Sequence, residues 1–113
     1  MTIFVHAQIH GLAGRGAELR EVLVEHATVT AAMEGSLGSV AYAPLGGEAG
    51  EYVLDAWWRD ESALRAHYGS AAYGRYVEIV GELLARPSDV QIHYVERTVR
   101  PTPDASLDPA RQG

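Results

Sequence analysis

The segment EYVLDAWWRDESALRAHYGS, residues 51–70, contains the clearest strand-to-helix transition in the chain. Its first part, EYVLDAWW, is rich in aromatic and β-branched side chains, which predicts a strand that ends at Trp58. Neighbouring side chains in a strand point to opposite faces of the sheet. We therefore expect Trp57 and Trp58 to separate, with Trp58 on the face of Leu54 and Trp57 on the face of Asp55.

The second part of this segment carries helix-start signals. Asp60 can cap a helix, Glu61 is favourable in its first turn, and Ser70 can cap a second start after Gly69. Pro87 ends the pattern. The chain is thus predicted to be helical from about residue 61 to 85, with a break near Gly69.

Two elements are predicted before the central segment. Residues 2–10, TIFVHAQIH, alternate apolar and polar side chains as a strand with two different faces does. Residues 15–33 repeat apolar groups at intervals of three and four, which is typical of an amphipathic helix. The predicted buried stripe of this helix is Leu19, Val22, Leu23, His26, either Val29 or Thr30, and Met33.

The remaining strands flank the central segment. SVAYAPL, residues 39–45, predicts a strand that is antiparallel to 51–58 across the GGEAG connection, and VQIHYVERTV, residues 90–99, predicts the last strand. Residues 100–113 hold three prolines and little to bury. We interpret them as a flexible C-terminal tail or as an arm on a partner subunit.

The order strand, helix, strand, strand, helix, strand predicts an α+β protein with a ferredoxin-like split βαββαβ sheet over residues 1–99 and both helices on one face. The other face would then carry solvent-exposed apolar side chains. Monomers rarely tolerate such a patch. We therefore expect a homodimer whose two sheets pack face to face. The apolar side chains of that face are Phe4, Val53, Trp57 and Val95.

Composition limits the partners. The chain has 113 residues, a formal net charge of -6, 47% hydrophobic residues and no cysteine. The negative charge argues against nucleic acid and anionic membranes, and the missing cysteines exclude a thiolate nucleophile or a Cys-ligated metal. The beginning of the chain resembles neither a signal peptide nor a membrane span. We expect a cytoplasmic protein with a small, uncharged or weakly acidic ligand.

Motifs for metals and nucleotides are weak. His6, Asp55 and His93 lie on predicted strands with compatible parity, and could form a facial metal triad or a polar network inside the dimer. GLAGRG, residues 11–16, lacks the glycine spacing of a dinucleotide loop and predicts a turn. No metal site and no cofactor are predicted.

The segment of residues 51–96 resembles the antibiotic biosynthesis monooxygenase (ABM) superfamily of dimeric α+β barrels. The resemblance lies in the strand ending in Trp, the short helix ALRAH, the Ser-initiated second helix and the final strand. The turn at Gly14 and the run EGSLGSVAYAP extend it over about residues 2–98. The family includes cofactor-free oxygenases of polycyclic phenols, quinol oxygenases, haem-degrading enzymes, isomerases and members without a known activity.

Comparing individual residues with the branches of the family narrows the range of reactions that the resemblance implies. Where the haem-degrading branch has a helical Trp, an iron-ligating His and a strand Asn, this chain has His67, Val77 and Ala7. The polyketide-oxidising branch has Asn and Tyr where this chain has Leu54 and Leu64. The residues of this chain therefore match neither the haem-degrading site nor the polyketide-oxidising site.

The quinol-oxygenase type is the most similar, through Trp58, the LxAH element with Leu64 and His67, and Tyr42-Ala43-Pro44. The resemblance implies a cavity under the helices in which His67 takes a substrate proton. Its implied catalytic residues are His67, Trp58 and Tyr73. Its implied substrate-binding residues are His26, Tyr42, Leu54, Leu64, Tyr68 and Val77.

The predicted function is oxidation of a hydroxylated (poly)cyclic aromatic or quinol to a quinone, with dioxygen as co-substrate and no cofactor. A deprotonated phenol can itself reduce dioxygen, so the protein need supply only a base, hydrogen bonds and a dry cavity. His67 and His26 could instead be structural core histidines. The alternatives for the whole protein are a non-oxidative isomerase or cyclase, and a stress protein that binds a small aromatic without turnover.

Overall fold

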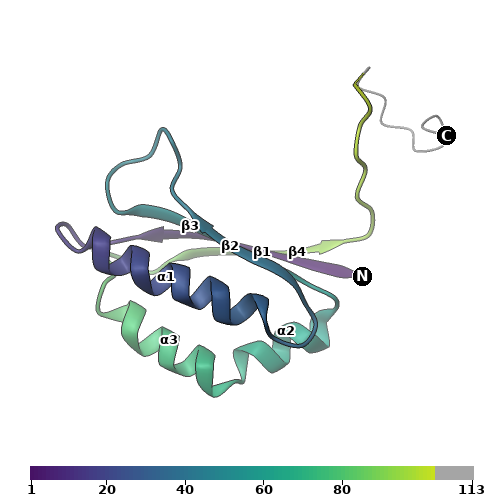
Figure 1. Ribbon diagram of the computed structural model, residues 1–113, viewed down its shortest axis with the longest axis horizontal. Helices are drawn as coiled ribbons and strands as arrows, with labels where there is room; N and C mark the ends of the chain where they lie inside the picture. The colour runs from purple at the N-terminus through teal and green to yellow at the C-terminus, as the bar shows by residue number, and fades with distance from the viewer. Residues whose placement is uncertain (104–113) are drawn as a thin grey trace.

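One antiparallel sheet, with strands in the order β2-β3-β1-β4, forms one layer of the molecule, and three helices lie against one of its faces, below the sheet in Figure 1. The computed structural model describes residues 1–103. The strands are β1 (Thr2–His10), β2 (Ser36–Tyr42), β3 (Glu51–Trp58) and β4 (Asp89–Val95). The helices are α1 (Gly16–Ala31), α2 (Glu61–Tyr68) and α3 (Ala71–Gly81). This confirms the predicted α+β ferredoxin-like arrangement.

The break in the predicted helix has its cause in two caps. The Asp60 side chain accepts a hydrogen bond of 2.9 Å from the backbone N–H of Ala63, which starts α2. The Ser70 hydroxyl accepts a bond of 3.2 Å from the backbone N–H of Tyr73, which starts α3. Each cap satisfies a helix-start N–H that has no partner inside the helix.

Two predicted strand boundaries are wrong for identifiable reasons. β2 begins at Ser36 and not at residue 39, because an irregularity between Ser36 and Gly38, where Gly38 has φ 144°, lets the chain join β3 earlier. β4 ends at Val95 and not at residue 99. Val95 pairs with Thr2, the first residue of β1, so later residues have no neighbouring strand to bond.

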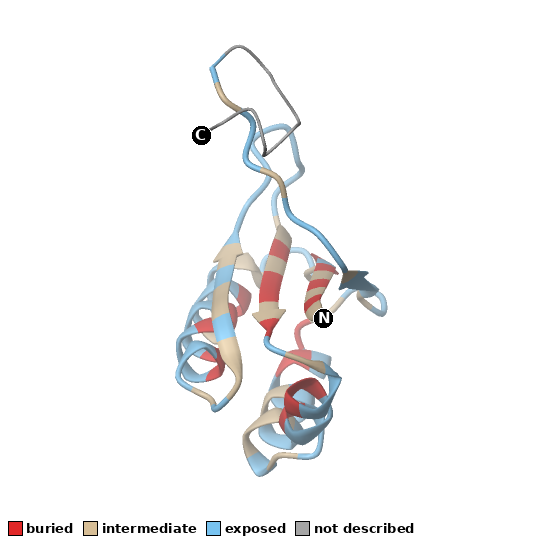
Figure 2. Cartoon of the chain, turned by 90° about the vertical axis from the view of Figure 1, so that its right-hand side faces the viewer, coloured by how far each residue is buried: buried red, intermediate tan, exposed pale blue. Residues whose placement is uncertain are grey.

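The register divides each strand between two environments. On β1, Ile3, Val5, Ala7 and Ile9 face the helices and are all buried. On β3, Trp58 and Ala56 lie on this same side. Figure 2 shows buried residues on the central strands and on the inward sides of the helices, whereas β4 at the edge is exposed.

Within residues 1–103, no helix lies on the opposite face of the sheet. Phe4 pairs with Trp57 across β1 and β3 and with His93 across β1 and β4, and their rings stack at centroid distances of 5.1 and 5.8 Å. This confirms that Trp57 and Trp58 point to opposite faces. We call this side, with the strand residues Phe4, His6, Val53, Asp55, Trp57 and His93, the open face.

Residues after β4 leave the sheet without forming a helix or strand through residue 103. The predicted tail, residues 100–113, continues into positions 104–113, which lie outside the described residues. Among residues 1–103, no helix has the length and apolar character that crossing a membrane requires.

Candidate functional site

A cavity of about 200 Å³ lies between the helix-covered face of the sheet and the three helices. The sheet contributes Val5, Ala7, Ile9, Ser39, Leu54, Ala56, Trp58 and Val90 to its lining. The helices contribute His26, Thr30, Leu64, His67, Tyr68, Tyr73, Tyr76, Val77 and Val80, and Ser88 completes it. The lining combines an apolar floor with hydroxyl and imidazole groups on the helix side, as ligand sites commonly do.

His67 lies at the centre of an aromatic cluster. Its ring stacks on Trp58 at a centroid distance of 4.8 Å and an interplanar angle of 29°. Tyr73 meets it edge-on at 5.1 Å, and Tyr68 lies at 5.6 Å. Aromatic contacts at such distances favour a fixed ring orientation. The imidazole is thus held against the wall of the cavity.

The local sequence explains this placement. Trp58 ends β3, and Asp60 caps α2 only two residues later, so the helix turns back over the strand. Leu64 and His67 are three residues apart and share the buried side of α2. The Ser70 hydroxyl donates a bond of 2.7 Å to the backbone oxygen of His67 and fixes the end of the helix.

His26 brings a second imidazole to the cavity from α1. Its ring stacks on Tyr76 at a centroid distance of 3.6 Å and an angle of 13°, and it lies 5.7 Å from the His67 ring. Nε2 of His26 lies 3.4 Å from the Thr30 hydroxyl. His26 therefore fits both of its predicted roles in position: it has a hydrogen-bond partner in the core, as a structural histidine does, and it lines the cavity.

Burial sets the protonation of the cavity groups. Burial, with a smaller repulsion from His67, lowers the pKa of His26 from 6.5 to about 4. Burial also lowers the pKa of His67 and raises the pKa of Tyr73 and Tyr76 above the ordinary value of 10. At neutral pH both imidazoles are uncharged and can accept a proton, while the tyrosines keep theirs and can donate hydrogen bonds.

The cavity lining contains no Asp, Glu, Lys or Arg among residues 1–103. Among the buried side-chain polar atoms of the described part of the chain, Oγ of Ser39 in this lining has no hydrogen-bond partner. A buried polar atom left unbonded costs about 1–3 kcal/mol. Ser39 is therefore suited to bond a polar group of a ligand.

All but one of the predicted site residues line this cavity: His67, Trp58, Tyr73, His26, Leu54, Leu64, Tyr68 and Val77. Tyr42 does not. It pairs with Val53, so its side chain belongs to the open face, where its hydroxyl donates a bond of 2.6 Å to Oδ2 of Asp55. The expected role of Tyr42 at the cavity is corrected accordingly.

The sequence interpretation missed several lining residues, of which Tyr76 and Ser39 matter most. Tyr76 follows Tyr73 by three residues, so helical spacing could have identified it. Thr30, which the helix pattern left open against Val29, is the buried one of the two. Ser39 depends on the pairing of β2 with Ala56 of β3, which no local pattern reveals.

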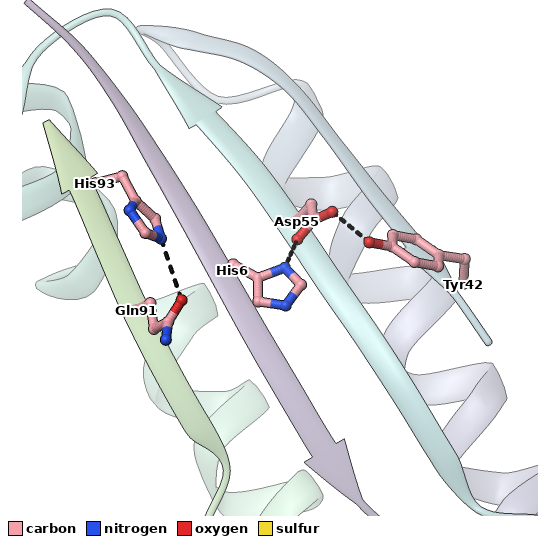
Figure 3. A network of polar contacts seen from close by, with 5 residues as sticks. All are labelled: His6, Tyr42, Asp55, Gln91 and His93. Atoms are coloured by element: carbon pink, nitrogen blue, oxygen red, sulfur yellow. Dashed lines mark hydrogen bonds and ion pairs between the residues drawn. The ribbon is translucent and has the colours of Figure 1, made fainter. Parts of the chain in front are cut away.

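Two of the three candidate metal residues, His6 and Asp55, join Tyr42 in a polar network on the open face (Figure 3). Nδ1 of His6 lies 2.6 Å from Oδ1 of Asp55, and the other oxygen of Asp55 accepts the bond from Tyr42. His93 lies beyond, with Nε2 3.3 Å from Oε1 of Gln91. His6 pairs with Gln91 and not with His93. Within residues 1–103, no three His, Asp or Glu side chains are arranged to hold a metal ion.

The sheet topology and the aromatic cavity define a class of protein: a ferredoxin-like α+β fold with a cavity between sheet and helices. The model of the antibiotic biosynthesis monooxygenase family matches residues 2–79. The chain belongs to this family. A comparison with curated proteins found no match.

Solved structures show the same fold. Rv0793 from Mycobacterium tuberculosis is 30% identical, with 88% of this chain and 100% of that chain covered and a TM-score of 0.80. PA3566 from Pseudomonas aeruginosa is 19% identical over 85% of this chain and 95% of its own, with a TM-score of 0.76. A mutant form of SnoaB, a cofactor-independent oxygenase from Streptomyces nogalater, is 18% identical over 86% and 95%, with a TM-score of 0.75.

Proposed function

We propose that the protein is a cofactor-independent monooxygenase that oxidises a hydroxylated aromatic, of the quinol or anthrone type, to a quinone with dioxygen. The observation that carries this proposal is the buried imidazole of His67, stacked on Trp58 in a cavity whose lining residues include no Asp, Glu, Lys or Arg. Such a site can take a proton from a weakly acidic phenol. It also has the apolar walls that a planar aromatic ring requires.

The first step is removal of a substrate proton by His67. An uncharged imidazole is the usual general base near neutral pH, and a positioned base contributes about 10²–10⁴-fold to a rate. Tyr73, whose ring meets His67 edge-on, can donate a hydrogen bond to the substrate oxygen as negative charge develops there. Burial keeps the Tyr73 phenol protonated, because it raises the pKa of that group.

The second step joins the substrate anion and dioxygen. One-electron transfer to dioxygen and recombination of the radical pair at a carbon that carries hydrogen form a carbon–oxygen bond and give a peroxide anion. Return of the proton from His67 converts it to a hydroperoxide. Loss of water then breaks the O–O bond and the C–H bond of that carbon and leaves the quinone carbonyl. One oxygen atom enters the product and the other leaves as water, with all electrons drawn from the substrate. The apolar wall formed by Val5, Leu54 and Val80 would exclude water from the radical pair.

The comparisons support the proposal at the level of the family. The chain belongs to the antibiotic biosynthesis monooxygenases, and SnoaB, a cofactor-independent oxygenase, shares its fold. The cavity residues add the chemical argument, because a base, hydroxyl donors and an apolar floor are the groups that this chemistry needs from the protein.

We also propose that the protein works as a homodimer joined through the open face. Phe4 and Trp57 form a stacked aromatic pair there, and Val40, which pairs with Asp55, is 42% exposed. No helix in the described part of the chain covers these side chains. A second copy of the same sheet would cover them symmetrically and would enclose the His6–Asp55–Tyr42 network.

The test is aerobic and anaerobic incubation of the purified protein with a small panel of hydroquinones and anthrones, followed by product identification. We expect oxygen-dependent quinone formation, with one atom of isotopically labelled dioxygen in each product molecule. Turnover of a panel member without oxygen would favour the isomerase or cyclase. Saturable binding without turnover under either condition would favour the binding protein.

A further inference from the structure

We propose that Met33 is a positioning residue for the base: its thioether holds His67 in the tautomer with the proton on Nδ1 and leaves the Nε2 lone pair for the substrate. Nδ1 of His67 lies 3.1 Å from Sδ of Met33. The catalytic consequence rests on the proposed function, whereas the tautomer is a property of the folded protein alone.

The assignment of the proton follows from what a thioether can do. Sulfur in methionine has lone pairs but no hydrogen, so it accepts a hydrogen bond and never donates one. A bond between Met33 and Nδ1 therefore requires the proton to be on Nδ1. A neutral imidazole carries only one N–H. Nε2 must then be the basic nitrogen.

The rest of the surroundings keeps the ring neutral and in place. Trp58 of β3 stacks on the ring. The rings of His26 of α1, Tyr68 of α2 and Tyr73 of α3 lie at centroid distances of 5.7, 5.6 and 5.1 Å from it. None of these groups carries a charge at neutral pH. Burial lowers the pKa of His67, so the form with both nitrogens protonated is a minor one above the ordinary pKa of 6.5.

The position of Met33 is itself fixed by the turn after α1. Its backbone N–H donates to the oxygen of Thr30 at 3.1 Å, and its oxygen accepts from the N–H of Ser36 at 3.1 Å. Its side chain packs against the core cluster that includes Trp58 and Leu64. The sulfur thus reaches His67 from a braced backbone, on the side of the ring away from Nε2.

A thioether differs from the carboxylate that often orients a catalytic histidine. A carboxylate beside Nδ1 would favour the charged imidazolium and raise the pKa of the histidine. The uncharged Met33 orients the ring without that effect. The arrangement therefore gives a base that is both oriented and unprotonated in a site without charges.

The test uses protein labelled with nitrogen isotope in histidine and long-range nitrogen–proton NMR spectra, recorded at a pH where His67 is neutral. Free histidine favours the proton on Nε2, so we expect His67 to stand out with its proton on Nδ1. Met33→Leu keeps the volume and removes the acceptor, and should shift the tautomer ratio towards Nε2–H by about 3- to 10-fold, the range of one net hydrogen bond. Met33→Gln restores an acceptor and should return the ratio towards that of the wild type.

The kinetic arm follows the same variants on a substrate that the wild type oxidises. We expect kcat of Met33→Leu to fall by a similar factor with little change in KM, and Met33→Gln to recover part of it. A wild-type His67 with its proton on Nε2, or a tautomer ratio that Met33→Leu leaves unchanged, overturns the proposal. The NMR result does not depend on turnover. An inactive protein would refute the proposed function, and the NMR spectra would still decide whether Met33 sets the tautomer of His67.

Discussion

Acid should destabilise this protein through His26 more than through an ordinary histidine. Burial, assisted by His67, lowers the pKa of His26 from 6.5 to about 4. Between these values the unfolded chain binds more protons than the folded protein, so the stability present above pH 6.5 is lost as the pH falls towards 4. The full shift corresponds to about 3 kcal/mol. Solvent at the cavity mouth should reduce this to about 2 kcal/mol.

The perturbation that isolates this effect is His26→Gln, which keeps a polar side chain and removes the titration. Urea unfolding, followed by the fluorescence of Trp57 and Trp58, gives the free energy of unfolding at about pH 7.5 and about pH 4.5. We expect the wild type to lose about 2 kcal/mol more than the variant between the two conditions. His10→Gln serves as the matched control, because His10 lies outside the cavity, near Asp89 and Arg86.

The comparison between the two pH values matters more than either value alone. Loss of the stacking on Tyr76 will destabilise His26→Gln at both pH values and cancels in the difference. If the wild type and His26→Gln lose equal stability on acidification, His26 is not held neutral by burial, and the electrostatic description of the cavity is refuted.

Three further predictions concern the cavity and the open face. Ser39→Ala should leave the free energy of unfolding unchanged or slightly raised, because the Ser39 hydroxyl has no partner within residues 1–103. The same variant should bind substrate more weakly by about 1 kcal/mol in titrations. Equal affinity would show that Ser39 does not contact the ligand. Trp58→Phe should raise KM more than it lowers kcat in steady-state kinetics, since an aromatic wall remains; a loss confined to kcat would contradict this. Trp57→Arg should convert a sedimenting dimer into a monomer of about 12 kDa, whereas a wild type that is monomeric at all concentrations would refute the dimer.

The elements whose signals are local could be predicted from the sequence. Strand alternation separated Trp57 from Trp58, and the caps Asp60 and Ser70 explained the interrupted helix. His67 could be placed near Trp58 because only a short turn separates the strand from the helix. In each case the evidence lies within about ten residues, where backbone geometry leaves few alternatives.

Apart from Tyr76, the features that sequence reasoning missed depend on pairing between distant segments. The face on which Tyr42 lies is set by the register of β2 against β3, and that register includes an irregularity near Gly38. A shift of one residue moves a side chain to the other face of a sheet. The contact between Met33 and His67 joins positions 34 residues apart, and no periodic pattern specifies it.

The central claim is that His67 is the base of an oxygen-dependent reaction. The most direct measurement is the pH dependence of quinone formation by the wild type, by His67→Ala and by the control His10→Ala. Because burial lowers the pKa of His67, we expect the wild-type rate to rise with pH, with the midpoint of the rise below 6.5, the ordinary pKa of histidine. His67→Ala should lose about 100-fold or more in rate, together with this rising limb, while His10→Ala keeps both. A His67→Ala variant with wild-type turnover and the wild-type pH profile would show that His67 is a core residue and would contradict the account.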